Sequence, residues 1–201
     1  MTITGRLAGF FPALYLLLAG TCLALSVAWS VLWAAGLVVV LYLLPPLLWR
    51  LYKRVLGHVK HIWALNRPQR CDWWVAHQLQ SPYIAFPMLE SGLRLVPGLY
   101  SAWLRLWGAQ VGRAIHWTPQ LDLLDRHNLK LGDRIVFGHR VALCCHVVVK
   151  KKSGLLILIE RGIDIGDDCF IGATAAIGPG VKIPAGSHIS YGSEIRFKYD
   201  A

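Results

Sequence analysis

The strongest constraint on the fold is a six-residue period in the C-terminal part of the chain. Isoleucine recurs at every sixth position from Ile165 to Ile195, and glycine follows the first three of these isoleucines, at Gly166, Gly172 and Gly178. Alternate side chains of a strand point to opposite faces, so an even period keeps every isoleucine on one face. A helix would scatter them around its surface. The period therefore predicts a parallel β-helix, with glycine and proline at its corners, rather than an ordinary antiparallel sheet.

A less regular set of repeats precedes this stretch. Apolar residues six positions apart begin at Val111 and continue in a cleaner set from Leu131. The spacing from Leu131 to Ile165 is not a multiple of six, so we expect an insertion between them. Residues 150–154, Lys-Lys-Lys-Ser-Gly, are the expected protruding loop. The apolar residues 155–159 would then contact the membrane, a neighbouring subunit or the segment before the repeats.

These repeats resemble the hexapeptide-repeat acyltransferases, over roughly residues 108–197. The resemblance implies a left-handed parallel β-helix with about three hexapeptides per coil. It also implies a homotrimer with sites at the subunit boundaries, and acetyl-CoA or another acyl-CoA as the acyl donor. Because some proteins with this fold are not acyltransferases, the resemblance is more specific for the fold than for the reaction.

The N-terminal part has the composition of a membrane anchor. No charged residue occurs between Arg6 and Arg50, and the whole chain is 55% hydrophobic with a mean hydropathy of +0.46. One helix needs about 20 residues to cross the hydrocarbon core of a bilayer, so two transmembrane helices fit, over residues 7–25 and 31–49. A second apolar span directly after the first argues against a cleaved signal peptide. A helical hairpin in the core of a soluble protein is also disfavoured, because no polar residues mark a face of either helix.

The basic residues predict the orientation of these spans. Six cations follow the second span: Arg50, Lys53, Arg54, Lys60, Arg67 and Arg70. The excess of lysine and arginine places both termini and the β-helix on the cytoplasmic side of the inner membrane. The net charge of +10 beside apolar segments favours an anionic membrane surface as the partner. We expect no nucleic acid, because the chain has no recognisable nucleic-acid-binding motif.

The segment between the anchor and the repeats is rich in tryptophan and basic residues. This composition is typical of helices at a membrane surface, and an equally plausible arrangement is a small helical subdomain packed on the β-helix. Helices are expected over residues 50–65, 72–80 and 99–107, as a collar over the open first coil. The predicted domains are therefore a transmembrane hairpin (1–49), an interfacial collar (50–107) and a β-helix (108–201).

The cysteines do not predict a disulfide framework or a metal site. Their number, five, is odd, and their spacing is irregular, which favours a reducing compartment. Cys144 and Cys145 are adjacent rather than two to four residues apart, and no second ligand pair follows. We therefore expect no metal.

Acyl transfer needs a base, and His146 is the strongest candidate. Histidine suits this role because its pKa lies near neutral pH. His146 ends a repeat just before the insertion, and in the resembling family the catalytic histidine lies in a repeat before a protruding loop. His139 is an alternative base, and a structural role for both remains open. Asp125 would orient His146 by accepting its other ring proton, or would be a turn residue beside Asn128.

The acyl donor implied by the resemblance carries phosphates that need positive charge. Lys182, Arg196 and Lys198 lie on the later coils and are the candidate phosphate ligands; each is alternatively a solvated surface charge. Lys150–Lys152 could instead bind an anionic lipid. The glycines of the repeats are assigned to the fold and not to a ligand.

The sequence thus predicts a membrane-bound, CoA-dependent O- or N-acyltransferase. Its acceptor would be a hydroxyl or amine of an envelope glycan, a lipid-linked intermediate or another amphipathic molecule. Two alternatives stay open: a non-catalytic β-helix acting as a membrane scaffold, and a zinc-dependent lyase or hydratase on the same fold.

Overall fold

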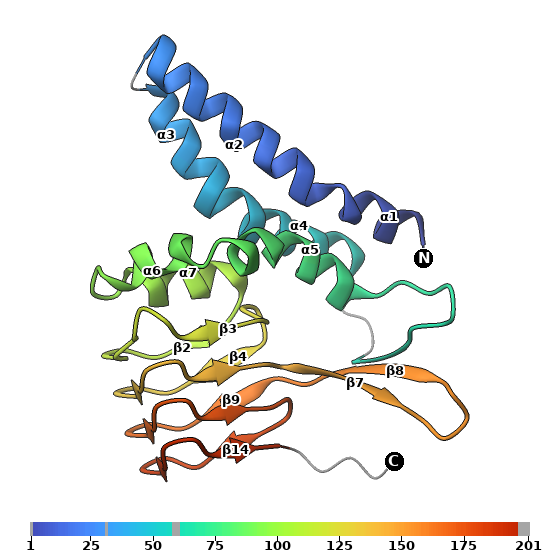
Figure 1. Cartoon of the computed structure of the whole chain (residues 1–201), viewed down its shortest axis with the longest axis vertical. Coiled ribbons are helices and arrows are strands. Elements are labelled where there is room, and N and C mark those ends of the chain that lie inside the picture. The colour runs from blue at the N-terminus through green and yellow to red at the C-terminus, as the bar shows by residue number, and fades with distance from the viewer. Residues whose placement is uncertain (1, 31, 58–60, 197–201) are drawn as a thin grey trace.

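The protein is built in three layers along its longest axis (Figure 1). The structure is a computed structural model that describes residues 2–30, 32–57 and 61–196. Two long apolar helices form one end, three shorter helices form the middle, and stacked coils of short strands form the other end.

The apolar helices correspond to the predicted hairpin. The first is α1 (Ile3–Gly9) followed by α2 (Phe11–Ala28), and the second runs through α3 (Leu32–Val38), the π-helical η1 (Val39–Leu43) and α4 (Leu44–Leu56). Both are long and apolar enough to cross a membrane, judged by length and composition. Only 11% and 17% of their most apolar windows are buried, unlike the core helix of a soluble protein.

Three of the four predicted ends of these two helices are wrong by several residues, whereas the second helix begins at Leu32, next to its predicted start. The second helix continues past Trp49 to Leu56, because α4 becomes amphipathic where the charges begin. Trp49 is buried against the rest of the protein, whereas Arg50 and Arg54 are exposed. A change in composition therefore marks the end of the apolar surface but not the end of the helix.

The middle layer contains α5 (Asp72–Ala85), α6 (Met88–Arg94) and α7 (Leu99–Trp107). The prediction of α7 is confirmed, and α5 extends five residues beyond its predicted end, with Pro82 inside it. The helix predicted through residue 65 is wrong beyond Leu56, because Ile62–Ala64 form a strand, β1, and α6 was not predicted. The layer covers the first coil as expected, with the Trp117 ring edge-on to Tyr100 at 4.9 Å.

The C-terminal half is a parallel β-helix, as the six-residue period predicts. Three parallel sheets have the strand orders β2-β4-β9-β12, β3-β6-β11-β14 and β5-β10-β13. Successive coils contribute one strand to each sheet, with the bounds β2 (Gln110–Val111), β3 (Asp122–Leu123), β4 (Leu129–Leu131), β5 (Val136–Phe137), β6 (Ala142–Leu143), β9 (Ile163–Ile165), β10 (Phe170–Ile171), β11 (Ala176–Ile177), β12 (Lys182–Ile183), β13 (His188–Ile189) and β14 (Glu194–Ile195).

The repeated apolar residues stack inside the coils. Leu131 pairs with Ile165 and Leu143 with Ile177, and these side chains are buried. Close stacking explains the glycine that follows the isoleucines. A Cβ on Gly172 would meet the backbone of Ser190 and Tyr191 at 2.6 Å, so only glycine fits there without a shift.

The insertion between the repeats is a two-stranded arm. β7 (His146–Lys150) and β8 (Leu156–Glu160) are antiparallel, and β1 adds to β8 as a third strand. The expected loop at residues 150–154 is thus the tip of the arm. Of the three contacts considered for the apolar residues after it, the structure shows the one with the preceding segment, where Trp63 pairs with Leu158 and both are buried.

Candidate active site

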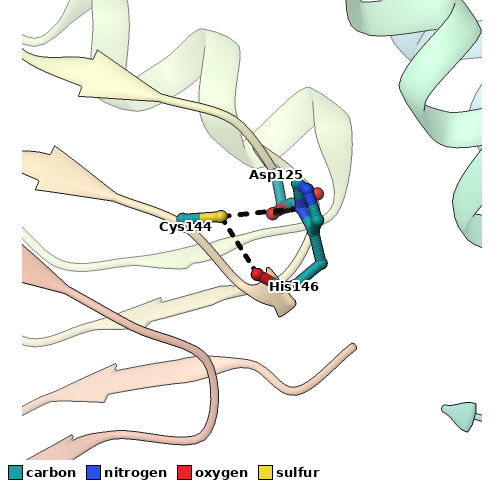
Figure 2. A group of neighbouring side chains, drawn as sticks. All are labelled: Asp125, Cys144 and His146. Atoms are coloured by element: carbon teal, nitrogen blue, oxygen red, sulfur yellow. Dashed lines mark hydrogen bonds and ion pairs between the residues drawn. The ribbon is translucent and has the colours of Figure 1, made fainter. Parts of the chain in front are cut away.

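His146 lies where the arm leaves the β-helix, and the stacking of the coils brings Asp125 to it. β3 pairs in parallel with β6, so that Leu123 lies opposite Leu143. Asp125 and Cys145 are each two residues further along their coils. The Asp125 Oδ2 atom accepts a hydrogen bond from His146 Nδ1 at 2.7 Å (Figure 2). It also accepts one from the Cys145 backbone N–H at 2.8 Å. The register between the two stacked coils therefore brings the two side chains together.

Asp125 is a buried carboxylate that accepts hydrogen bonds from three N–H groups. Its Oδ1 atom accepts from Trp73 Nε1 at 3.1 Å, in addition to the two bonds to Oδ2. Burial by itself would raise the pKa of the Asp125 carboxyl. The hydrogen bond and positive charge of His146 outweigh burial and hold this pKa below its usual value. The Asp125 backbone carbonyl also accepts from the Asn128 N–H, so the expected turn is present as well.

His146 is held as the partner of this carboxylate. Burial by itself would lower the pKa of His146, but the hydrogen bonds to Asp125 and Cys144 and the charge of Asp125 raise it to about 10. Its side chain is 17% exposed. With Nδ1 bound to Asp125, the second ring nitrogen, Nε2, can take a substrate proton when the imidazole is in its neutral form.

Cys144 completes a group of three side chains that could each offer one ligand atom to a metal ion. Its Sγ lies 3.6 Å from His146 Nδ1 and donates to the His146 carbonyl at 3.2 Å (Figure 2). The Asp125, Cys144 and His146 donor atoms lie within 4.8 Å of one another, which suits a zinc ion. A metal there would have to replace the proton on Nδ1 and share an Oδ2 atom that already accepts from the Cys145 amide. The expectation of no metal stays a prediction.

Trp73 is part of the site, although in the sequence it is only one of several tryptophans in the segment before the repeats. Besides its bond to Asp125, its ring packs against His146 at 4.6 Å between centroids and against His77 at 4.9 Å. Burial and the charge of His146 lower the pKa of His77. No periodic signal in the sequence connects residue 73 with residue 146, so this contact depends on how α5 packs on the coils.

A groove of about 230 Å³ begins at His146 and follows the β6-β11-β14 face. Cys144, Ala176 and Gly178 line its length, and Glu194 and Arg196 line it on the last coil. Arg196 forms an ion pair with Glu194.

The candidate phosphate ligands are not gathered in one place. Lys182 lines a different pocket, of about 310 Å³, together with Lys130 and Asp164. Lys198 lies outside the described residues. The alternative base, His139, is exposed in a corner where its carbonyl accepts from the Thr174 N–H, and it is not among the described residues that line either pocket.

The fold and the site thus define a parallel β-helix with a helical cap and a His–Asp pair at the base of an arm. No protein-family model and no curated protein matches the chain. Among solved structures it is similar to a hexapeptide-repeat acetyltransferase from Vibrio cholerae, with a TM-score of 0.38 and 17% identity over 56% of this chain and 82% of that one. It is also similar to a maltose O-acetyltransferase from Clostridium difficile, with the same TM-score and identity over 58% and 77%. These likenesses cover about half of the chain.

Proposed function

We propose that the protein is a membrane-anchored acyltransferase that moves an acyl group, an acetyl group in the simplest case, from CoA to a hydroxyl or amine. The observation that carries the proposal is the buried Asp125 carboxylate bound to His146 beside a groove on the β-helix face. The chain's six-residue period and three parallel sheets fit the left-handed coil of the family that the repeats resemble.

The proposed reaction uses Nε2 of His146 as the base. It takes the proton from the acceptor hydroxyl or amine while the acceptor atom bonds to the thioester carbonyl carbon. The tetrahedral intermediate then collapses, the C–S bond breaks, and the departing thiolate receives the proton from the imidazolium. Asp125 stays ionised throughout and holds the ring in the tautomer with its proton on Nδ1.

The donor would lie in the groove, with Arg196 near its phosphates. Lys182 lies in another pocket, and it would reach the same donor only from a neighbouring subunit, which is the arrangement that a homotrimer with boundary sites would give. Lys198, which lies outside the described residues, would be a third phosphate ligand. Calorimetry with CoA in detergent separates this function from a non-catalytic scaffold, which would bind no CoA.

The acceptor would be an amphipathic molecule such as an envelope glycan precursor or a lipid-linked intermediate. Two apolar helices support anchoring in the inner membrane, and the cations that follow the second helix support a cytoplasmic β-helix. The site would then work close to the bilayer surface, where such acceptors are concentrated.

The test is transfer of labelled acetyl groups from acetyl-CoA in membranes containing the His146→Gln variant. Loss of general-base catalysis should lower the rate by about 10² to 10⁴. His139→Gln is the matched control, because that exposed histidine lies outside the groove, and it should transfer at the wild-type rate. Undiminished transfer by folded His146→Gln would remove His146 from the mechanism.

The group formed by Asp125, Cys144 and His146 favours one second candidate, a zinc-dependent lyase or hydratase. Metal analysis of the purified protein separates the two functions. Stoichiometric zinc that is lost in Cys144→Ser supports the second function, and protein without zinc that still transfers acetyl groups supports the first.

A further inference from the structure

A basic pocket lies at the end of α4, where this helix meets the end of α7. It has a volume of about 500 Å³, and its lining contains Arg50, Lys53 and Arg54. Lys53 and Arg54 follow Arg50 by three and four residues, so each lies beside Arg50 on the surface of the helix. The remaining lining residues are Trp49, Trp107, Gly108 and His127.

Two of the three cations of this pocket, Arg50 and Lys53, are held in place. Arg50 donates from Nε to the Leu106 carbonyl at 2.7 Å and from Nη2 to the Arg105 carbonyl at 2.5 Å, at the end of α7. A guanidinium has five N–H donors, so these two bonds orient Arg50 and leave other donors for a ligand. Lys53 Nζ lies 5.4 Å from the centre of the Trp49 ring. Such contacts distinguish a preformed site from freely moving surface charges.

The cations that line the pocket outnumber the carboxylates near it. None of the described residues that line it is a carboxylate. Two carboxylates lie near the pocket: Glu160 is bound to the lining residue His127 at 2.8 Å, and Asp72 accepts from Tyr52 and Arg70. Burial lowers the pKa of Lys53, and the charges of Asp72 and Glu160 partly oppose this shift. Three cations around one concave space favour an anion, and phosphate is the anion for which arginine and lysine together are best suited.

The position of the pocket indicates where the phosphate comes from. The cations begin where the apolar part of the second helix ends, which is the level of the lipid headgroups if this helix spans the bilayer. His127 in the pocket is two residues from Asp125 in the candidate active site. It is bound to Glu160, which pairs across the arm with His146. The pocket therefore lies between the membrane surface and the candidate site.

We propose that this pocket binds the phosphate of an anionic membrane lipid. The inference rests on the proposed membrane anchoring but not on acyl transfer. Arg50, Lys53 and Arg54 would contact the phosphate oxygens, and Trp49 and Trp107 would line the apolar side of the headgroup region. A lipid held there would fix the height of the β-helix above the bilayer, and with it the height of His146.

The test compares two double variants of the full chain in detergent micelles. Lys53→Gln/Arg54→Gln removes two cations from the pocket, and Arg50 is kept because it caps α7. Lys150→Gln/Lys151→Gln removes the same charge from the exposed tip of the arm. Retention of dioleoylphosphatidate and of dioleoylphosphatidylcholine is measured by native mass spectrometry over a range of lipid concentrations.

We expect the wild type to retain one dioleoylphosphatidate more tightly than dioleoylphosphatidylcholine. The pocket variant should lose about tenfold or more in affinity for phosphatidate, because charge-assisted hydrogen bonds are lost, and the arm variant less than about twofold. Equal losses in the two variants, or no loss in the pocket variant, would overturn the proposal. So would a result in which CoA displaces phosphatidate and the pocket variant loses CoA affinity alone, since the phosphate would then belong to CoA.

Binding and transfer fail separately in this design. His146→Gln should retain phosphatidate with wild-type affinity while it loses transfer. Wild-type transfer without phosphatidate retention would refute the lipid site and leave the proposed reaction standing. Retention without any transfer in the wild type would do the opposite.

Discussion

The pairing of His146 with Asp125 makes the stability of the protein depend on pH in a defined direction. The pKa of His146 is about 10 in the folded protein, against about 6.5 for a free histidine. The folded state therefore binds this proton more tightly than the unfolded state. The resulting stabilisation is fully present below about pH 6.5, falls as pH rises, and is gone above about pH 10.

The size of the effect follows from the shift. A rise of about 3.5 pKa units, at about 1.36 kcal/mol per unit, gives at most about 5 kcal/mol in the free energy of unfolding. The two side chains are 17% and 1% exposed, so solvent screens their interaction only weakly. Small domains are typically stable by about 5–15 kcal/mol, so a loss of this size is readily measured.

The assay is thermal unfolding followed by circular dichroism in one detergent, from pH 6 to pH 10.5. Wild type is compared with His146→Gln, which keeps every other titrating group. The melting temperature of the wild type should fall more steeply than that of the variant between pH 6.5 and pH 10, and the difference between the two should become constant above pH 10. Parallel curves across this interval would refute the raised pKa of His146.

Three further predictions test the reaction, the support of Asp125 and the packing of the coils. Because the base must be neutral, kcat/KM should rise about tenfold per pH unit towards the His146 pKa near 10; a pH-independent rate between pH 6 and pH 8 would contradict this. Trp73→Phe removes a hydrogen bond to the Asp125 carboxylate and should lower the free energy of unfolding by about 1.5–3 kcal/mol, measured by denaturant titration; Trp74→Phe, which loses only a bond to the Gly5 carbonyl, should cost about 0.5–1.5 kcal/mol. Gly172→Ala should destabilise the coils by about 1–3 kcal/mol or more, whereas Gly92→Ala in α6, with open space around its Cβ position, should be neutral or slightly stabilising. Equal melting temperatures for the two alanine variants would show that the coils do not stack this closely.

The sequence determined the architecture of the C-terminal half because its constraint is local and periodic. Isoleucine on every sixth residue and glycine after it leave few ways to bury the apolar face, and the coils from Ile165 to Ile195 follow that period. The arm was likewise visible as a break in the period. The two apolar helices could be recognised from composition, but their ends could not, because α4 continues as an amphipathic helix into charged residues.

Other features depended on contacts between segments far apart in the chain. Residues 62–64 form a strand only because β8 provides an antiparallel edge for them, and a helical reading of that segment was wrong for that reason. Pro82 lies inside α5, although proline usually interrupts a helix, because the packing of this layer outweighs the local cost.

The candidate site, too, could be predicted from the sequence only in part. Position before the insertion singled out His146, and Asp125 followed as its possible partner, but the 2.7 Å contact arises from the parallel register of β3 and β6. Trp73 and the basic pocket at Arg50, Lys53 and Arg54 had no signal in the repeats, since they form only when the helical layer packs on the coils. A short-range repeat can fix the shape of a solenoid from sequence alone, whereas the groups that meet at its edge are chosen by long-range packing.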